Sequence, residues 1–495
     1  MQLETLDLIV FIVVTVGSVL FGASFYSKNK TSAQFTAGDA NFPSWVVGMS
    51  IFATFVSSIS FLALPGSAYS SNWNALVFSF SIPVAAILAA KFFVPLYREV
   101  GSISAYNYLE TRFGRWARVY ASLCYLLTQL MRTGAILLLL ALPIHALLGF
   151  NVRAIIVVTG LAVTIYSVLG GIRAAIWTDV IQGTVLVLGA ITCALILTFT
   201  MPEGSSQLFE IAKAHDKFSL GNFGPSVTES TFWVVLIYGL FINLQNYGID
   251  QNYIQRYMVT DSVQKAKNST LFGALLYVPV SVIFFYIGTG LFAYYTAQPE
   301  LLPPELHQPG KGDMVFPFFI VNVLPVGLTG LLIAAIFSAG MSTISTSLNS
   351  SATIILTDYY RMYINKNASE RASMTVLYLS SAVIGFFGVL IALSLVGVES
   401  VLDAWWALAS VFSGGMLGLF LLAFLSKKVR RIDAIVGVIC GVLVITWMSL
   451  SPLTFNEGPL VAFRSPFHAN LTIVIGTLVI FLVGFISMKF FSKRK

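Results

Sequence analysis

Long apolar runs, separated by short polar loops, constrain the fold of this chain more than any other feature. Of its 495 residues, 57% are hydrophobic and only 10% are charged, whereas a soluble globular protein carries about 25% charged residues. A run of about twenty apolar residues crosses the roughly 30 Å of bilayer hydrocarbon as a helix. A helix also satisfies its own backbone polar groups there. The sequence therefore predicts an all-α polytopic protein embedded in a lipid bilayer.

The apolar runs predict about thirteen transmembrane helices. Their expected ranges are 6–26, 44–66, 74–96, 119–148, 154–170, 176–200, 231–250, 270–295, 316–358, 373–397, 403–426, 432–450 and 467–490. The range 316–358 is longer than one crossing needs and is expected to include a cytoplasmic extension. The first run follows Glu4 and Asp7 without a basic residue, whereas a cleaved signal peptide begins with basic residues. We therefore expect this run to span the membrane.

The distribution of basic residues predicts the orientation. An odd number of spans places the two termini on opposite sides. With the N-terminus outside, the cytoplasmic segments hold 22 of the 28 Lys and Arg residues, including Lys91 and Lys489 at the cytoplasmic ends of their spans. The external loops hold 5, and Arg132 lies deep inside a span. Basic loops favour the cytoplasmic side. We therefore expect a multi-pass protein of the cell (inner or plasma) membrane, with its N-terminus outside and its C-terminus in the cytoplasm.

Several function classes are disfavoured by what the sequence contains. The three cysteines, Cys124, Cys193 and Cys440, fall in apolar stretches and do not form a disulfide framework. The basic residues sit in short loops, so the net charge of +7 does not indicate nucleic-acid binding. The sequence has no nucleotide-binding loop and no acid–base pair placed for catalysis. We expect a protein that is not an enzyme. Any movement of a solute through it would be driven by an ion gradient or by the solute's own downhill flow.

The sequence shows no tandem repeat, but ten of the predicted helices fit two inverted halves of five. Inverted repeats of transporters are usually weak in sequence. One helix would precede the two halves and two would follow them. The expected division is a leading helix and cytoplasmic loop at 1–43, a first repeat at 44–200, an external loop and second repeat at 201–430, and two C-terminal helices at 431–495.

Two segments are poor candidates for uninterrupted helices. Segment 49–66 contains a cluster of serine and β-branched residues and ends in Pro65-Gly66, which disfavour a helix. Segment 239–248 carries two glycines and three amide side chains at membrane depth. Irregular backbone in a bilayer must be covered by protein or must line a water-filled cavity. Both segments therefore predict a central cavity.

A run rich in serine and threonine, 338–351, lies inside a predicted span. Ser342, Ser345, Thr346 and Asn349 recur at helical spacing and share one face. Oxygen ligands at close spacing suit a hard, weakly held cation. Small polar residues also let membrane helices approach closely. By itself the run is therefore consistent with an ion site and with helix packing.

Two ionisable residues stand out inside predicted spans, where charge is costly and usually functional. Arg132 lies near the middle of its span and offers a planar fork of donors that suits a carboxylate. No acid is evident at similar depth in neighbouring spans, so Arg132 is expected to bind an anionic substrate or to line the cavity. The alternative is a structural pair with a protein carboxylate.

Asp179 is the second of these residues and lies near the start of the predicted span 176–200. It is expected either to cap that helix, because an acid in the first turn is favourable, or to give a negative ligand to a cation. Asp250 lies at the end of a predicted span, where we expect a solvated role.

Three segments carry a resemblance to a known family. They are the runs Gly170–Gln182, Gln255-Arg256-Tyr257 and Ala334–Ser350. At this spacing, and with about thirteen helices, the chain resembles the sodium:solute symporter family over essentially its whole length. The resemblance implies a leucine-transporter-type fold of five plus five helices in inverted repeat. It also implies sodium-coupled uptake of a small organic solute by alternating access.

The resemblance further implies where sodium binds. A first site would lie between the second and ninth helices and would use the carbonyls of Ala53, Val56 and Ala339 and the hydroxyls of Ser342 and Thr343. Some members have a second site, whose matching positions here are Asp179, Ser342, Ser345 and Thr346. Ser342 would then be shared by both sites. Asn349 and the serines beyond it would keep a packing role.

Within the family, the chain is most similar to the bacterial sialic acid symporters. Arg132 matches the arginine that holds the substrate carboxylate there, and Ser57 and Ser60 match substrate-contacting positions. The chain departs from the pattern at Ala75 and Ser79, where an aromatic residue and a glutamine contact the sugar. The broken segment also lacks the acidic residue of the sugar-transporting branch, which disfavours a neutral hexose.

The leading hypothesis is a sodium-driven symporter of a carboxylated sugar such as sialic acid. The alternatives are a sodium-coupled symporter of a neutral sugar or polyol, and a uniporter or channel without ion coupling. The expected substrate-binding residues are Ser57, Ser58, Ser60, Ala75, Ser79, Arg132, Asn243 and Asn246. The expected partners are the substrate, Na⁺ and the lipid bilayer, without nucleic acid or an obligatory protein partner.

Overall fold

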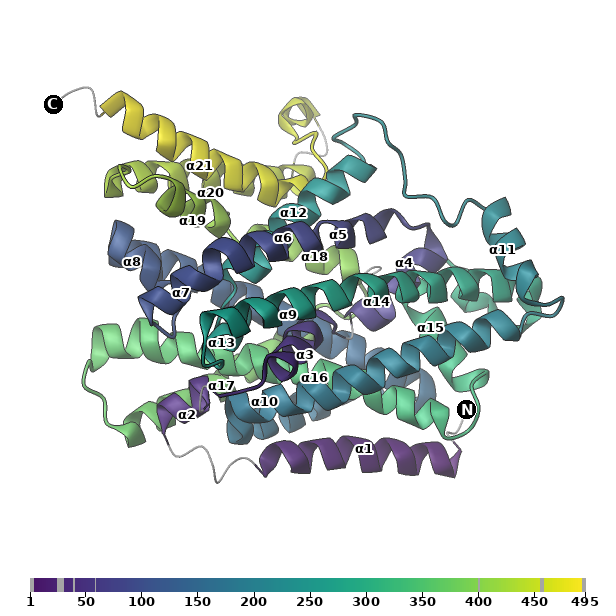
Figure 1. Cartoon of the computed structure of the whole chain (residues 1–495). Coiled ribbons are helices and arrows are strands. Elements are labelled where there is room, and N and C mark those ends of the chain that lie inside the picture. Colours follow the sequence, from purple (N-terminus) through teal and green to yellow (C-terminus); the bar gives the residue numbers. More distant parts are fainter. Residues whose placement is uncertain are drawn as a thin grey trace.

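The computed structural model describes residues 4–24, 31–38, 41–57, 59–398, 401–454 and 458–491. Within these ranges the chain forms helices and no β-strand. Most of the long helices run side by side along one axis (Figure 1). This arrangement suits apolar segments whose backbone groups must be satisfied within each helix, and it confirms the predicted all-α class.

The elements follow one another in this order, with η marking 3₁₀- or π-helical stretches. The first part contains α1 (Thr5–Ala23), α2 (Ser32–Ala37), α3 (Ser44–Phe55), η2 (Ile59–Ala63), α4 (Leu64–Ser70), η3 (Asn74–Leu76), α5 (Val77–Phe80), α6 (Ile82–Leu88), η4 (Ala89–Phe93), α7 (Val94–Val100), α8 (Asn107–Phe113), α9 (Arg115–Leu148), α10 (Val152–Phe199), α11 (Ser205–Ala214) and α12 (Phe232–Ile249). The second part contains α13 (Gln251–Met258), α14 (Val263–Ala297), η5 (Pro299–Leu301), η6 (Pro304–His307), α15 (Gly312–Asn322), α16 (Leu328–Ile354), η7 (Ile355–Ile364), α17 (Glu370–Ser394), α18 (Val401–Phe412), α19 (Met416–Leu425), α20 (Arg431–Thr454), η8 (Gly458–Phe463) and α21 (Leu471–Phe491).

The multi-pass character is confirmed, whereas the number thirteen stays a prediction. Among the described residues, 10 helices are long and apolar enough to cross a membrane, and two bent helix pairs raise this number to 12. The predicted span 154–170 corresponds to a shorter apolar helix, Val152–Ile165. It forms the first part of α10, which continues through a kink at Gly171.

The kink in α10 corrects one interpretation of Asp179. Gly171 has a φ of 60°, a left-handed conformation that glycine adopts without a steric penalty. The helix bends there and runs on to Phe199. Asp179 therefore lies about two turns inside the second part of the helix. The proposed helix-capping role of Asp179 is wrong, because no helix begins at residue 176.

The predicted single span 316–358 is also wrong. The chain forms two helices there, α15 and α16, and the turn between them contains Pro325 and Gly327. Gly327 has a φ of 91°, and the carbonyl of Pro325 accepts from the backbone N–H groups of Leu328 and Thr329. Apolar residues on both sides of this short turn hid the interruption from the hydropathy pattern.

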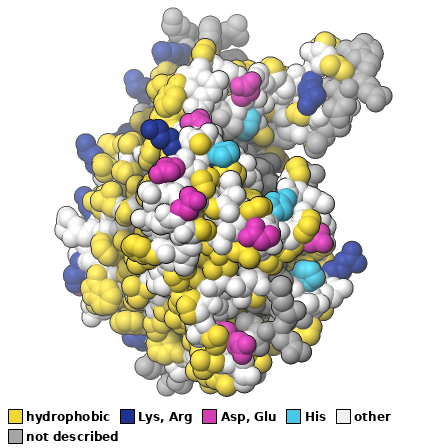
Figure 2. Space-filling view, turned by 90° about the vertical axis from the view of Figure 1, so that its right-hand side faces the viewer, with side chains coloured by type: hydrophobic (Ala, Val, Ile, Leu, Met, Phe, Trp, Pro, Cys, Tyr) yellow, Lys and Arg dark blue, Asp and Glu magenta, His cyan; other side chains and the backbone are white. Residues whose placement is uncertain are grey.

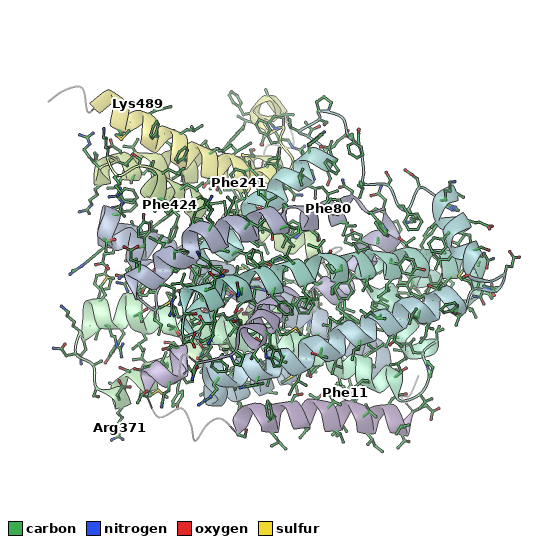
Figure 3. All side chains as sticks on the ribbon, in the orientation of Figure 1. Phe11, Phe80, Phe241, Arg371, Phe424 and Lys489 are labelled. Carbon is green, nitrogen blue, oxygen red and sulfur yellow. The ribbon has the colours of Figure 1, made fainter. Side chains whose placement is uncertain are left out.

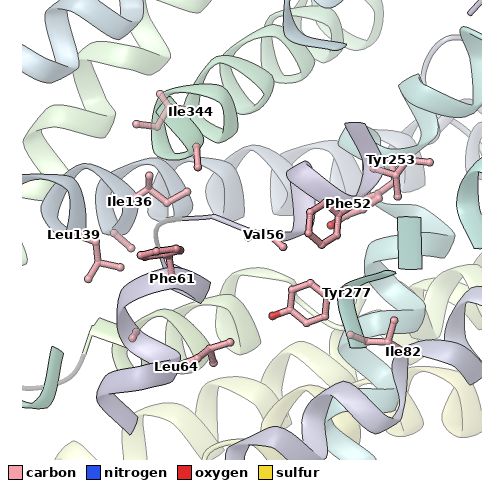
Figure 4. Packing of buried hydrophobic residues seen from close by; sticks show 14 of the residues in the cluster. Phe52, Val56, Phe61, Leu64, Ile82, Ile136, Leu139, Tyr253, Tyr277 and Ile344 are labelled. Carbon is pink, nitrogen blue, oxygen red and sulfur yellow. The ribbon is translucent and has the colours of Figure 1, made fainter. Parts of the chain in front are cut away.

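The predicted interruption in segment 49–66 is confirmed, although it lies earlier than the proline. Helix α3 ends at Phe55, Val56 is extended, and the two halves of this broken helix are bent by 61°. Pro65 instead lies further along, in α4, which continues from η2 without a gap. Figure 4 shows the break at Val56, between Phe52 of α3 and Phe61 of η2.

The predicted irregularity at 239–248 is wrong, because α12 runs through it as a regular helix to Ile249. The interruption comes at Asp250, whose backbone is extended and which caps α13. A further bend that the sequence did not reveal divides the predicted span 403–426. There α18 and α19 differ in direction by 46°, around Gly414 and Gly415 with φ of 56° and 67°.

Helix α14 packs closely against both halves of the broken helix. A Cβ atom on Gly273 would lie 2.5 Å from the carbonyl oxygen of Gly48 in α3. A Cβ atom on Gly288 would overlap the carbonyl group of Pro65 in α4. Two glycines thus allow backbone-to-backbone contact on either side of the break.

The two ends of the helix bundle differ in charge. Arg371 and Lys489 lie at one end (Figure 3). The other end, which includes α11 in Figure 1, faces the viewer in Figure 2 and shows acidic side chains and histidines. Helix α11, the connections on both sides of it and the connection between α14 and α15 supply the exposed residues Glu203, Glu210, His215, Glu229, Glu305 and His307.

Lys217 ties the loop after α11 to the end of α4. Its side chain is only 5% exposed. Its Nζ donates to the carbonyls of Tyr69 and Ser71, each at 2.7 Å, and lies 3.8 Å from the centroid of the Phe292 ring. Burial lowers the pKa of Lys217 to about 8 from its ordinary value of 10.5. The second half of the broken helix is thus held at its end by a cation.

Lys217→Met should lower the unfolding temperature and change its pH dependence. Between about pH 8 and pH 10.5 the unfolded chain binds more protons at Lys217 than the folded protein does, so the unfolding free energy of the wild type rises with pH. The methionine variant lacks this contribution. Thermal unfolding of both purified proteins from about pH 7 to about pH 10 tests this. Parallel pH profiles would contradict it.

Candidate functional site

A narrow cavity lies beside the break between α3 and α4. Its volume is about 100 Å³, enough for a small group of water molecules. A larger ligand therefore enters only when the lining side chains move apart. Six of the eight predicted substrate residues line the cavity, namely Ser57, Ser60, Ala75, Ser79, Arg132 and Asn246.

The other two predicted substrate residues are not part of this lining. Ser58 lies outside the described residues. Asn243 is buried beside the lining, and its Nδ2 donates to Ser81 Oγ at 3.0 Å. Gln245 lines the cavity instead, together with Asn246. All three amides were predicted to lie at the cavity, but the side chain of Asn243 is engaged by Ser81 of the neighbouring helix segment.

Arg132 is half-buried in the cavity wall, as the sequence predicts. Its Nη2 donates to the carbonyl of Thr54 at 2.7 Å. Thr54 belongs to the last turn of α3, where carbonyls carry the negative end of the helix dipole. No ion pair of Arg132 exists within the described parts of the chain. One bond thus orients the guanidinium, and further N–H groups remain for a ligand.

Asp250 corrects the expectation that it is solvated. It is only 7% exposed and lines the same cavity as Arg132. One carboxylate oxygen accepts from the backbone N–H of Asn252 at 2.8 Å, and the other accepts from Gln129 Nε2 at 3.3 Å. An acid therefore does lie at the depth of Arg132. Its position at the end of a predicted span disguised its role as the cap of α13.

Aromatic side chains enclose two sides of the cavity. The ring of Phe55 packs against Tyr277, with 4.4 Å between the centroids, and lies 6.4 Å from Tyr253. On another side Phe78 stacks on Trp406 at 5.7 Å. Figure 4 shows Tyr277 directed toward the break in the helix. An apolar wall with a few polar groups is typical of small-molecule sites.

The residues of the first expected sodium site lie buried where α16 packs against α3. The side chains of Ala53, Val56, Ala339, Ser342 and Thr343 are each at most 6% exposed. Thr343 Oγ1 donates to the carbonyl of Ala339 at 3.0 Å, so two of the expected oxygens are already adjacent. These neutral oxygens suit a monovalent cation.

The residues of the second expected site form a buried polar cluster around Asp179, which is 0% exposed. Its Oδ1 accepts from Ser342 Oγ, and its Oδ2 accepts from Ser50 Oγ. Thr346 and Ser345 lie buried on the same helix as Ser342. The structure thus brings Asp179 to the serine and threonine stripe.

Arg256 is a buried member of this cluster that the span analysis missed. It was counted among the cytoplasmic residues because 251–258 falls between two predicted spans. In the structure α13 is buried, and Arg256 is only 1% exposed. Its Nη2 donates to Asp179 Oδ2 at 2.8 Å and to Thr346 Oγ1 at 3.0 Å. The only signal was its place in the Gln-Arg-Tyr run.

The far end of the stripe packs helices together, as expected. Asn349 Oδ1 and Thr353 Oγ1 accept from Gln255 Nε2, at 3.3 Å and 3.0 Å. Ser350 Oγ donates to Gln255 Oε1 at 2.6 Å. Gln255 therefore joins α13 to α16.

Comparison with known proteins identifies the family. The model of the sodium:solute symporter family matches residues 35–441. The chain belongs to the sodium:solute symporter family. It is 32% identical over 477 residues to the sodium/sialic acid symporter NanT of Aliivibrio fischeri, covering 96% of this chain and 91% of that protein. It is 35% identical over 430 residues to the sodium/sialic acid symporter SiaT of Proteus mirabilis, covering 86% of each.

More distant proteins and solved structures agree with this assignment. The human sodium-coupled monocarboxylate transporter 1 is 27% identical, over 94% of this chain and 76% of that protein. A solved structure of a Na⁺-coupled sialic acid symporter, substrate-bound and outward-open, has a TM-score of 0.89 at 32% identity and covers 98% of each chain. MHP1, a nucleobase-cation-symport-1 transporter, shares the fold alone, with a TM-score of 0.57 at 15% identity. This symporter is thus a sodium-coupled transporter and not an enzyme.

Ser342→Ala removes the hydroxyl that both expected sodium sites share. We expect the sodium concentration for half-maximal uptake to rise about tenfold, which corresponds to about 1.4 kcal/mol. Sodium titration of uptake into proteoliposomes measures it.

Ser351→Ala is the matched control on α16. Ser351 is buried, its hydroxyl has no hydrogen-bond partner in the described chain, and it belongs to neither site. This variant should keep the wild-type sodium requirement. The same requirement in Ser342→Ala would exclude Ser342 as a ligand.

Proposed function

We propose that this symporter imports sialic acid or a related carboxylated sugar together with sodium, by alternating access. Arg132 is the observation that carries this proposal. It presents a guanidinium to a small, partly aromatic cavity at the break of a membrane helix. A planar fork of donors binds a carboxylate in bidentate geometry. Two relatives at 32% and 35% identity are sodium/sialic acid symporters.

The remaining lining residues favour a substrate with a hydroxylated sugar ring over a simple carboxylic acid. Ser57, Ser60 and Ser79 offer hydroxyl groups, and Asn246 offers an amide. These groups donate to and accept from sugar hydroxyls. Ala75 and Ser79 are small, so the aromatic contact comes from Phe78 and Trp406, which stack at the same cavity. The substrate therefore differs in its contacts on this side from the pattern of the sialic acid symporters.

Sodium acts in this proposal by holding α3 and α16 together. The first ion takes the carbonyls of Ala53, Val56 and Ala339 and the hydroxyls of Ser342 and Thr343. These residues are buried at the contact of the two helices. The ion therefore favours the conformation in which that contact is closed. A second ion takes Asp179, Ser342, Ser345 and Thr346.

The arrangement in the membrane follows the charge of the bundle ends. We propose that the acidic end seen in Figure 2 is external and that the end with Arg371 and Lys489 is cytoplasmic. The N-terminus then lies outside, in agreement with the distribution of basic residues. The five-plus-five inverted repeat, with one helix before it and two after, is part of the same proposal.

Arg132→Ala should weaken sialic acid binding about a hundredfold or more, because losing a buried charged partner costs about 2–5 kcal/mol. Binding is measured on purified protein, with sialic acid and with its uncharged carboxamide. The carboxamide should bind both proteins equally and weakly. Lys91→Ala removes an exposed cation outside the cavity lining and should bind sialic acid normally. Equal sialic acid binding by Arg132→Ala and the wild type would exclude the carboxylate role.

Uptake into liposomes separates this function from its alternatives. An inward sodium gradient should drive accumulation of sialic acid above its external concentration, and potassium should not replace sodium. Equilibration without sodium would indicate a uniporter. Sodium-driven accumulation of a neutral sugar or polyol, without accumulation of sialic acid, would indicate the neutral symporter.

A further inference from the structure

A protein cation already occupies part of the proposed second sodium site. The guanidinium of Arg256 bonds two of its four residues, Asp179 at 2.8 Å and Thr346 at 3.0 Å. Its Nε donates to Ser50 Oγ at 2.7 Å and its Nη1 to the carbonyl of Asn252 at 2.8 Å. Arg256 is 1% exposed and Asp179 is 0% exposed. The pair is therefore shielded from water.

The two oxygens of Asp179 have different partners. Oδ1 faces Ser342, a residue of both proposed sodium sites, whereas Oδ2 faces Arg256 and Ser50. A sodium ion at Oδ1 and a guanidinium at Oδ2 would share one negative charge. Charges of equal sign at such a separation repel strongly in a buried environment. A buried carboxylate without any cation is equally unfavourable.

We propose that Arg256 is a tethered cation that competes with sodium for Asp179 and so sets the sodium affinity of the second site. The proposal rests on the second sodium site proposed above. Without sodium, Arg256 compensates the charge of Asp179 and keeps the site closed. Sodium binding weakens this ion pair, and the guanidinium then withdraws toward its bond with Asn252.

The position of Arg256 also connects the ion to the substrate. Arg256 and Asn252 lie on α13, and Asp250, the cap of this short helix, lines the substrate cavity. Gln129 accepts from Asn252 Nδ2 at 3.1 Å and donates to Asp250 at 3.3 Å. A movement of α13 that releases Arg256 therefore also moves a charged wall of the cavity. This is a physical route for coupling between the two ligands.

Sodium-dependent thermal stability of purified, substrate-free protein tests the proposal. Sodium chloride replaces choline chloride at constant ionic strength. Arg256→Gln should be less stable than the wild type in choline. Its half-maximal stabilisation should need a sodium concentration at least about tenfold lower, because the competing charge is gone. Arg256→Lys keeps a cation and should retain the wild-type sodium requirement.

Two further variants exclude a purely structural effect. Arg118→Gln removes another, largely buried arginine, which pairs with Asp358 at 2.6 Å and Glu110 at 2.7 Å. It should lose stability without a change in sodium requirement. The double variant Asp179→Asn, Arg256→Gln should regain stability in choline and lose the gain in sodium affinity.

Each other outcome has a defined meaning. An unchanged or higher sodium requirement in Arg256→Gln overturns the proposal. So does an Arg256→Gln protein that stays unfolded at every sodium concentration, whether or not the double variant folds, because sodium then does not replace the guanidinium. A wild type that sodium does not stabilise over choline would instead contradict the proposed sodium sites themselves.

Discussion

The break between α3 and α4 is the constraint on which the rest of the structure depends. Backbone groups freed at membrane depth need partners other than water. Arg132 supplies one by donating to Thr54, α16 covers the break from one side, and Tyr277 of α14 faces it from another (Figure 4). The same lack of helical partners that makes this segment costly makes its oxygens available to an ion and its surroundings available to a substrate.

Hydropathy predicted the transmembrane helices well because lipid-facing residues such as Leu188 and Leu379 must be apolar. It failed for α13, a short helix whose buried residues include Gln251, Asn252 and Arg256. Such a helix is hidden inside the protein by other helices and not by lipid, so its polarity resembles that of a loop. The burial of α13 depends on tertiary contacts, which a local sequence pattern does not reveal.

The sequence predicted which residues belong to the candidate site more accurately than it predicted their contacts with one another. Arg132 and Asp179 were recognised because charge at membrane depth is rare. Their charged neighbours were not, since Asp250 caps α13 and Arg256 lies within it, and this short helix has the polarity of a loop. Likewise the amides of α12 were assigned as a group, although Asn243 turns away from the cavity and bonds Ser81. The spacing of these residues fixes their arrangement around the helix, but hydropathy does not show which side of the helix faces the cavity.

The glycine contacts of α14 have a mechanical consequence. Because Gly273 contacts the backbone of α3 and Gly288 contacts that of α4, α14 braces both halves of the bent helix. A hinge motion at Val56 would separate one of the two halves from α14 and open a void between them. The low-energy motion is therefore that of a rigid block, in which α14 and both halves move together against the helices on the far side of the cavity.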